Sequence, residues 1–401
     1  MKGMVSAALL SCVLLSVGAQ AQVSGGIVKI GVLGDQSGAF SGPTGKGSVL
    51  AAQMALEDFG PTVNGAKIEL VSADHQNKVD VGSNIARTWF DQDGVDMITD
   101  LGNSAVALAV SDLGKQKNKA VAVAGGAVTA LTGKACNAQT VHWVFDSYSQ
   151  ANTFARAVLA EGLKTWFFLT VDFAYGLNLE ETTAGIVKEL GGTVVGSVRH
   201  PLTNSDFSSF LIQAQASKAQ VVALANGGSD TANSLKQAQE FGLTKNQRIA
   251  GLAMSPLDVH GVGLATAQGA LVAEAYYWDM NDETRAFGKR FFARHGAYPT
   301  MQQAGVYSAV LHYLKSVKAA NTDDGALIVA KMKELPTEDP IFGKGYVRAD
   351  GRKIHDFHLF QVKTPAESKY PWDYYKLVRT VPGDQAFMPM SKGGCPLVAG
   401  K

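Results

Sequence analysis

Four polar or glycine-rich loops, each following an apolar run, hold the residues of this sequence that are best suited to bind a small molecule. Ser104 opens a predicted helix, where it caps the helix and free backbone N–H groups can hold an anion. Gly125 and Gly126 let a ligand approach the backbone closely, whereas Phe40 and Tyr175 provide aromatic faces. Singly, each residue also fits a plain structural role, but four such loops after successive strands predict a ligand site. The loops read DQSGAF at 35–40, LGNS at 101–104, AGGA at 124–127 and DFAYG at 172–176.

Catalytic and metal-binding signatures are incomplete in this sequence. Residues 42–48, GPTGKGS, do not match a phosphate-binding loop, because glycine stands where Ser or Thr should follow the lysine. Residues 261–266, GVGLAT, lack the third glycine of a dinucleotide-binding turn. His355 and His358 lie three apart in a strand pattern, so they point to opposite faces and cannot share one metal. We therefore expect a protein without enzymatic activity, bound metal or cofactor.

The composition is that of a packed protein with substantial cores. The 401 residues are 46% hydrophobic and 18% charged and include 43 glycines, which suits two or three α/β domains with many tight turns. Lys and Arg number 36 against 35 Asp and Glu, a balance that argues against a nucleic-acid-binding protein. Beyond the N-terminus, the apolar runs are shorter than the ~18–20 residues of a membrane span.

The N-terminus predicts export. Residues 1–21 begin with Lys2, continue through a short apolar stretch and end in AQA, which are the features of a secretory signal peptide cleaved after Ala21. The sequence LLSC allows an alternative in which Cys12 carries a lipid anchor. Because the apolar stretch continues past Cys12, we favour cleavage after Ala21.

Two cysteines, Cys136 and Cys395, remain in the mature chain after this cleavage. In an exported protein such a pair predicts one disulfide, with two unpaired thiols as the alternative. Both cysteines lie in loop-like sequence, so a bond between them would tie the C-terminal tail to the first half of the fold.

Apolar runs with strand character alternate with helical patterns along the mature chain. The run IVKIGVL at 27–33 is the first strand, after which Val49, Ala52, Leu56 and Phe59 recur at helical spacing. The cycle restarts in the middle of the chain. This alternation predicts an α/β protein with mostly parallel sheets, covered by helices, in two similar Rossmann-like lobes.

Several segments resemble a known family in their order and spacing. They are IGVLGDQSGAFSGPTGKGSVLAAQMALEDF at 30–59, VDMITDLGNSA at 95–105, DFAYG at 172–176 and QQAGVYSAVLHYL at 302–314. Over nearly the whole mature chain, the sequence resembles the substrate-binding proteins of ABC transporters of the branched-chain amino acid, leucine-binding-protein-like type. The sequences of residues 72–90 and 283–314 most resemble those of family members associated with aromatic acids.

The resemblance implies a type I periplasmic binding protein fold, with two lobes joined by three hinge crossovers. Lobe 1 would comprise residues 27–145 and 276–345, and lobe 2 residues 146–275 and 346–385, followed by a tail at 386–401. The protein would be a periplasmic monomer that binds no nucleic acid. It would capture a small molecule between its lobes and deliver it to an inner-membrane ABC permease. A ligand sensor for a separate signalling partner is an alternative role.

The resemblance also implies the ligand contacts. Ser104 matches the serine with which family members hold a ligand carboxylate. The loop at 125–127 matches the family's next ligand-binding loop, but the threonine of that loop is absent here. Tyr175 matches the tyrosine of the second lobe, and Phe40 would face it across the cleft. The residues expected to touch the ligand are Phe40, Asn103, Ser104, Gly125, Gly126, Ala127, Tyr175, Asn226 and Ser255.

The ligand class depends on a missing acid. Relatives that bind amino acids would place an acidic residue near 252–256, where this sequence reads LAMSP. Since a buried ammonium without a carboxylate partner is costly, we favour an aromatic or other small carboxylate that carries no charged amine. Branched-chain or other amino acids and amides are the alternative, in which the amine would be received by Asp35, Asp172 or Asp258.

Overall fold

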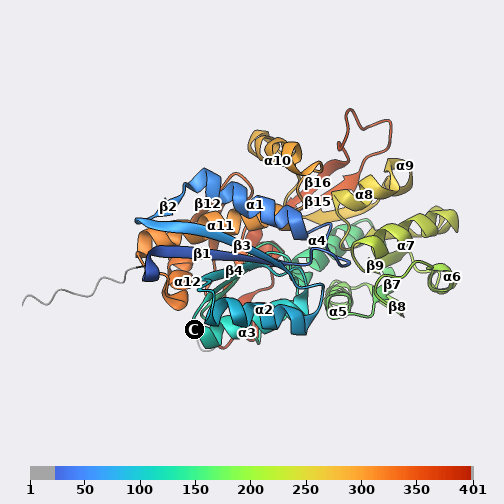
Figure 1. Ribbon diagram of the computed structural model, residues 1–401. Coiled ribbons are helices and arrows are strands. Elements are labelled where there is room, and N and C mark those ends of the chain that lie inside the picture. The colour runs from blue at the N-terminus through green and yellow to red at the C-terminus, as the bar shows by residue number, and fades with distance from the viewer. Residues whose placement is uncertain (1–22, 399–401) are drawn as a thin grey trace, which may run out of the picture.

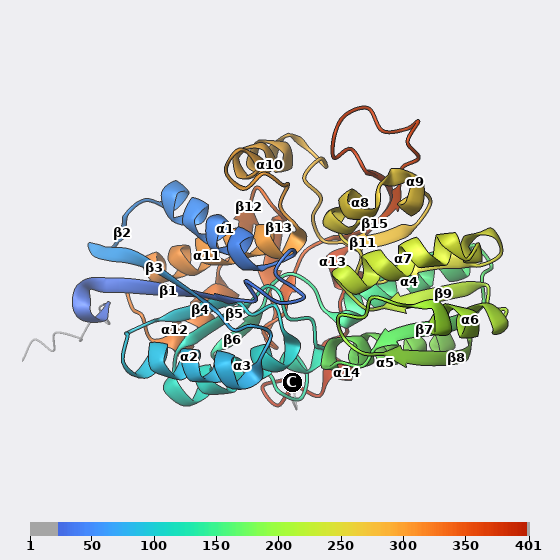
Figure 2. The same cartoon turned by 45° about the vertical axis from the view of Figure 1, so that its right-hand side comes forward.

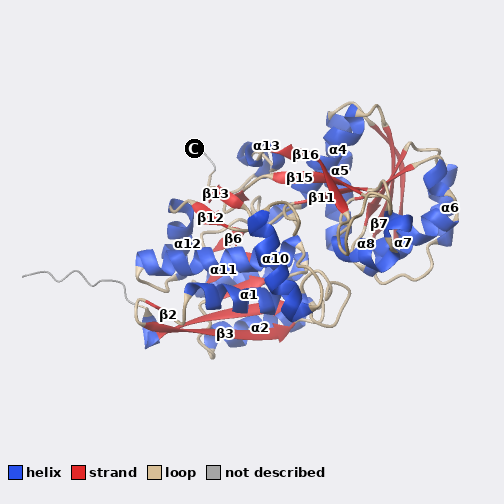
Figure 3. Ribbon diagram, turned by 90° about the horizontal axis from the view of Figure 1, so that it is seen from above, coloured by secondary structure: helices blue, strands red, loops and turns tan. Residues whose placement is uncertain are grey.

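The computed structural model describes residues 23–398 and arranges them around two separate central sheets (Figure 1). The predicted signal peptide at 1–21 lies outside the described residues. Seen from above, the sheets and their helices form two bodies side by side (Figure 3). We call the body that contains the six-stranded sheet lobe 1 and the body that contains the seven-stranded sheet lobe 2. Within residues 23–398, no helix is long and apolar enough to cross a membrane.

Lobe 1 is built on the first apolar run of the sequence. β1 (Ile27–Gly34) is buried over most of its length and pairs in parallel with β3 (Ala66–Asp74) and β4 (Met97–Asp100), as its β-branched residues predict. The sheet order is β2 (Thr62–Val63), β3 (Ala66–Asp74), β1 (Ile27–Gly34), β4 (Met97–Asp100), β5 (Ala120–Val123) and β6 (Thr140–His142). One face is covered by α1 (Gly45–Phe59), α11 (Met301–Ala320) and α12 (Gly325–Glu334), and the other by α2 (Val79–Asp91) and α3 (Ser104–Lys117).

Lobe 2 repeats this plan with two added antiparallel strands. Its sheet order is β16 (Tyr375–Val381), β15 (Phe357–Val362), β11 (Leu271–Glu274), β10 (Arg248–Gly251), β9 (Val221–Ala225), β7 (Thr165–Val171) and β8 (Thr193–His200). β15 pairs antiparallel with both of its neighbours, β11 and β16, and all other neighbouring strands of this sheet pair in parallel. Its helices are α4 (Ser147–Ala160), α5 (Ala174–Glu189), α6 (Ser208–Ala216), α7 (Ser229–Glu240), α8 (Pro256–Val262) and α9 (Leu264–Ala267). The α/β class expected from the alternating pattern is confirmed.

The chain passes between the lobes three times. The passages join β6 to α4, β11 to α10 (Asp282–His295), and β14 (Lys353–Ile354) to β15. β14 belongs to a small sheet with β12 (Thr337–Asp339) and β13 (Gly343–Val347), which packs on α12. The remaining short elements are η1 (Ser24–Gly26), η2 (Thr129–Leu131), η3 (Leu243–Lys245), α13 (Gly383–Ala386) and α14 (Met390–Gly393).

Two buried cations lie next to the third passage, and one of them contacts the first passage. The Arg352 guanidinium donates to the carbonyl oxygen of Phe145 at 3.1 Å and lies 3.6 Å from the Asp146 carboxylate. The neighbouring Lys353 ammonium lies 3.8 Å from the carboxylate of Asp339. Removing one member of a buried ion pair leaves an uncompensated charge. The Arg352 contacts therefore hold the first and third passages together, whereas Lys353 pairs with the end of β12 in the small sheet.

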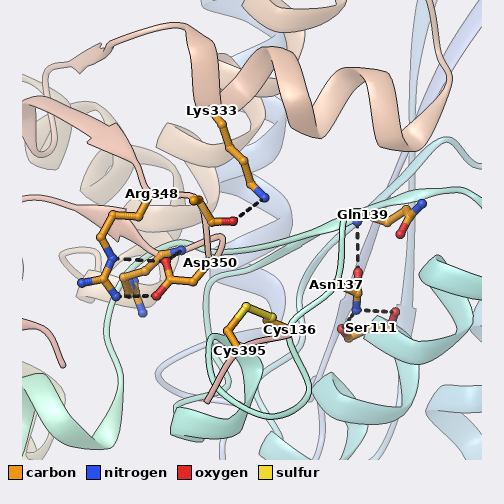
Figure 4. The surroundings of a disulfide bond; sticks show 10 residues. Ser111, Cys136, Asn137, Gln139, Lys333, Arg348, Asp350 and Cys395 are labelled. Atoms are coloured by element: carbon orange, nitrogen blue, oxygen red, sulfur yellow. Dashed lines mark hydrogen bonds and ion pairs between the residues drawn. A yellow bond between two sulfur atoms is a disulfide. The ribbon is translucent and has the colours of Figure 1, made fainter. Parts of the chain in front are cut away.

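A disulfide joins Cys136 of lobe 1 to Cys395 of the C-terminal tail, with 5.6 Å between the two Cα atoms (Figure 4). The predicted pairing is confirmed, and both residues are buried. Next to Cys136, the Asn137 side chain donates to the Ser111 hydroxyl of α3 at 2.8 Å. The loop that carries the disulfide is thus anchored on lobe 1.

Candidate ligand-binding site

A pocket lies between the lobes, at the carboxyl ends of their central strands, where parallel sheets place ligands. Both lobes contribute side chains and backbone to its wall. The lining residues are Phe40, Pro43, Thr44, Gly102, Ser104, Gly125, Phe145, Phe173, Tyr175, Gly227, Gly228, Ala253, Ser255, Asp258, Glu274, Met301 and Gln302.

The lobe 1 wall contains the start of α3, a helix of 14 residues. Asn103, not Ser104, is the N-cap: its side-chain oxygen accepts hydrogen bonds from the N–H groups of Ala105 and Val106. Its amide nitrogen donates to Asn77 at 2.6 Å, so Asn103 is occupied with structural contacts. This corrects the expectation that Ser104 caps the helix. Ser104 is the first helical residue and faces the pocket, where the positive end of the helix dipole favours an anion.

The glycine loop after β5 is largely used by the fold. The Gly125 N–H donates to the carbonyl oxygen of Asp100 at 2.8 Å, and the Ala127 N–H donates to the Ser104 hydroxyl at 3.2 Å. The Gly126 carbonyl oxygen contacts the His142 ring nitrogen at 2.7 Å. Gly125 alone of the three contributes to the described lining. Glycine is needed at this position because a Cβ there would lie 2.7 Å from Gly102 Cα, so the two loops of the wall pack directly on each other.

Asp100 is buried directly behind this wall. Its carboxylate oxygens make no well-aligned hydrogen bond among residues 23–398, although the Ser48 hydroxyl and the Gly45 N–H lie close enough to offset part of the effect of burial. Burial raises the pKa of Asp100 to about 8, and the nearby charge of Asp35 contributes to the increase. Asp100 and Leu101 both have positive φ, 76° and 59°. This uncommon backbone turns the chain from β4 into the loop that presents Gly102 and Ser104.

Aromatic rings from both lobes meet in the pocket. Phe40 of lobe 1 and Phe173 of lobe 2 lie with their ring centroids 6.2 Å apart. Asp35 positions Phe40, since its carboxylate accepts from the N–H groups of Gly38 and Phe40 at 2.7 and 2.9 Å. The Tyr175 hydroxyl donates to the Gln150 side-chain oxygen at 3.1 Å. Tyr175 therefore presents its ring and an accepting oxygen to the pocket, and burial raises the pKa of its hydroxyl.

The lobes touch at the mouth of the pocket. A Cβ at Gly228 would lie 2.7 Å from the carbonyl oxygen of Ala39, and a Cβ at Gly42 would lie 3.7 Å from Leu257. Gly228 also has a φ of 59°, a conformation that favours glycine. Asn226, in contrast, uses its amide on Thr231, Ser234 and His200 inside lobe 2, so the glycines that follow it form the pocket wall.

Two buried carboxyl groups form the lobe 2 wall. Ser255 is the N-cap of α8, and its N–H and hydroxyl both donate to the Asp258 carboxylate at 2.7 Å. Glu274 ends β11, is 2% exposed, and has an Oε2 atom without a hydrogen-bond partner among residues 23–398. Burial raises the pKa of Asp258 to about 6. Burial and the charge of Asp258 raise the pKa of Glu274 well above its usual range.

The positions of Asp258 and Glu274 overturn the expectation, based on LAMSP at 252–256, that lobe 2 offers no acid to a ligand amine. The sequence places no acid within 252–256, but the fold brings Asp258 and Glu274 to the pocket. Of the other acids considered, Asp35 is engaged in its own loop and Asp172 is exposed. Glu274 was missed, although a carboxylate at the end of an apolar strand, as in LVAE, is an unusual feature that points to a site. Asp100, at the end of the buried strand MITD, is a second carboxylate in such a position.

Within residues 23–398, no group of three or more His, Cys, Asp or Glu side chains is arranged to hold a metal ion. The chemistry that this site offers is hydrogen bonding, ion pairing and contact with aromatic rings. A largely apolar pocket with a few polar groups is typical of a small-molecule site.

Comparisons with known proteins agree with this architecture. The family profile described as periplasmic binding protein matches residues 27–369. The crystal structure of a periplasmic binding protein from Burkholderia mallei is 45% identical, with a TM-score of 0.90 over 95% of this chain and 100% of that one. A branched chain amino acid ABC transporter periplasmic ligand-binding protein from Burkholderia xenovorans LB400 is 42% identical, with a TM-score of 0.84 over 92% and 99%.

A third structure is similar in fold alone. It is the solute binding protein of an ABC transporter from Rhodopseudomonas palustris BisB5 in complex with 3,4-dihydroxy benzoic acid. It is 21% identical, with a TM-score of 0.81 over 89% of this chain and 98% of that one.

Proposed function

The chain belongs to the periplasmic binding protein family, and we propose that it is the solute-binding component of an ABC importer whose ligand is a small carboxylic acid that also carries a hydrogen-bond donor. Ligand capture would take place in the interlobe pocket, and delivery would be to an inner-membrane permease. We further propose that the chain is exported by cleavage after Ala21, acts as a monomer without catalytic activity, and closes by a hinge movement between the lobes.

The observation that carries this proposal is the pairing of opposite polar groups across one pocket. On the lobe 1 side, Ser104 and the start of α3 favour a negative charge. On the lobe 2 side, the unpaired Glu274 oxygen and the neighbouring Asp258 favour a donor. A ligand with only a carboxylate would leave the buried Glu274 oxygen unsatisfied, which is costly.

An α-amino acid fits these two walls best, because an ammonium both donates hydrogen bonds and compensates the charge of a buried carboxylate. The rings of Phe40, Phe173 and Tyr175 would surround its apolar side chain. The main reason for preferring a ligand without an amine was the absence of an acid at 252–256. The positions of Asp258 and Glu274 at the pocket weaken that reason. A hydroxylated aromatic acid is the second candidate, since its hydroxyl also donates to Glu274 and its ring fits the aromatic wall.

Isothermal titration calorimetry on the mature protein tests this function. We expect saturable binding of at least one member of a panel of leucine, phenylalanine, glutamine and 4-hydroxybenzoate. Glu274→Gln should weaken that binding by about tenfold or more, the effect of losing a hydrogen bond to a charged group. Glu240→Gln, on the exposed end of α7, is the matched control and should leave affinity unchanged. Equal binding by both variants and the unmodified protein would refute the role of Glu274.

A further inference from the structure

The C-terminal tail runs from lobe 2 back to lobe 1. It leaves the lobe 2 sheet at the end of β16, forms α13 and α14, and ends at the disulfide with Cys136 of lobe 1. Figure 2 shows α14 beside α5, close to the gap between the lobes. We call residues 382–398 the strap. Its disulfide closes a covalent loop across a sequence separation of 259 residues, and this loop contains all three passages between the lobes.

The first part of the strap is fixed to lobe 2. The Asn152 side chain of α4 donates to the carbonyl oxygen of Gln385 at 2.7 Å. Further along, the Lys392 ammonium pairs with the Glu189 carboxylate of α5 at 3.1 Å. The second contact is exposed and adds little stability by itself. Together the two contacts hold the strap along the surface of lobe 2.

The middle of the strap packs on the hinge. Phe387 is 1% exposed, and the Arg352 guanidinium lies over its ring at 4.4 Å. The His355 ring meets Phe387 edge-on, with 5.3 Å between the ring centroids. The carbonyl oxygen of Met388 accepts from the Arg348 guanidinium at 2.9 Å. The strap is therefore built into the segments that must bend when the lobes move.

The last part of the strap is fixed to lobe 1. Cys395 is bonded to Cys136, and Gly133 is so close to Gly393 that a Cβ there would lie 2.7 Å from the Gly393 carbonyl oxygen. Nearby, the lobes already meet, since the Thr129 N–H reaches the Asn178 side-chain oxygen of α5 at 3.4 Å. Opening at this edge would pull Cys136 away from the lobe 2 anchors of the strap.

We propose that the strap is a fourth, disulfide-fastened connection between the lobes, which limits how far they open. A segment held on both lobes reduces the conformational freedom of the open state more than that of the closed state. The strap thereby shifts the population toward closed conformations. The proposal does not depend on the identity of the ligand, because it concerns the free protein.

Small-angle X-ray scattering on the ligand-free mature protein tests this restraint with two variants. Cys136→Ser/Cys395→Ser removes the covalent link. Inserting six Gly/Ser residues between Gly393 and Gly394 keeps the disulfide but makes the strap slack. We expect both variants to have a larger radius of gyration than the unmodified protein. Lys392→Ala removes only an exposed ion pair and should leave the radius of gyration nearly unchanged. Circular dichroism confirms that each variant is folded.

Two results would overturn the proposal. If neither variant increases the radius of gyration, the strap does not restrain opening. If only the serine variant does so, the disulfide acts through local structure and not as a tether. Should the serine variant fail to fold, the insertion variant alone decides, because its disulfide is intact.

Discussion

Asp258 and Glu274 line the same wall of the interlobe pocket, and burial together with the charge of Asp258 raises the pKa of the Glu274 carboxyl well above its usual range. Burial and the charge of Asp258 therefore favour the protonated form of Glu274 in the free protein. An ammonium placed against this pair would favour the ionised carboxylate. Binding of an amine is consequently coupled to the release of a proton.

This coupling predicts a pH-dependent affinity. The affinity for an amino acid ligand should increase as the pH rises, by up to about tenfold per pH unit for each proton released on binding. Asp258, with a pKa of about 6, ionises as the pH rises through that value and strengthens the trend. Calorimetry in two buffers of different ionisation enthalpy measures the proton directly. Glu274→Gln should reduce the release, and an unchanged release in this variant would contradict the assignment.

Asp100 should make the protein less stable as the pH rises. The native pKa of about 8 lies above the ordinary value of 3.8. Below about pH 4 the carboxyl is protonated in both states, and between about pH 4 and 8 the unfolded chain loses the proton while the native state keeps it. Stability therefore falls across this window by the order of a few kcal/mol.

Asp100→Asn tests this expectation because its amide does not titrate. The melting temperature of the variant should exceed that of the unmodified protein by a margin that grows from pH 4 to pH 8. Asp112→Asn, an exposed change on α3, is the matched control. A constant margin across this pH range would show that Asp100 is ionised in the native protein.

Two adjacent residues at the start of α3 should separate ligand binding from stability. Ser104→Ala should lower the affinity for a carboxylate ligand by about 10-fold or more, because it removes a hydroxyl that faces the anionic end. Asn103→Ala should instead lower the free energy of unfolding by about 1 kcal/mol through loss of the helix cap. Calorimetry and urea unfolding of both variants measure these effects. A larger loss of affinity in Asn103→Ala would indicate that Asn103 contacts the ligand directly.

Reduction of the disulfide should destabilise the protein. In the chain-entropy model, a link that closes so long a loop contributes roughly 3–5 kcal/mol, and the buried positions of Cys136 and Cys395 make it slow to reduce. Thermal unfolding with and without a phosphine reductant measures the difference. Mass spectrometry of the non-reduced mature protein should find no free thiol, and two free thiols would contradict the bond.

The fold could be predicted from the sequence because its signals are local. Runs such as IVKIGVL are apolar and β-branched over their whole length, which is the pattern of a parallel strand buried on both faces. The disulfide could also be predicted, since the expected cleavage after Ala21 would leave only Cys136 and Cys395. The loop positions of Phe40, Ser104 and Tyr175 followed from the rule that ligands lie at the carboxyl ends of parallel strands.

The finer parts of the site depend on contacts that no local pattern encodes. Asn103 and Asn226 were expected at the ligand, but each finds hydrogen-bond partners within its own lobe. Glu274 reaches the pocket because β11 lies next to β10, so its strand ends beside the loop that carries Asp258. The residues that follow β10 therefore give no sign of this acid, which lies at the end of the next strand.

The most direct test of the proposed ligand class is calorimetry on the mature protein with matched pairs of acids that differ only in the donor. The pairs are phenylalanine and 3-phenylpropanoate, leucine and 4-methylpentanoate, and 4-hydroxybenzoate and benzoate. We predict that in at least one pair the donor-bearing acid binds about tenfold or more tightly than its partner, since only it satisfies the buried Glu274 oxygen. Equal or tighter binding by the acid that lacks the donor would contradict this ligand class.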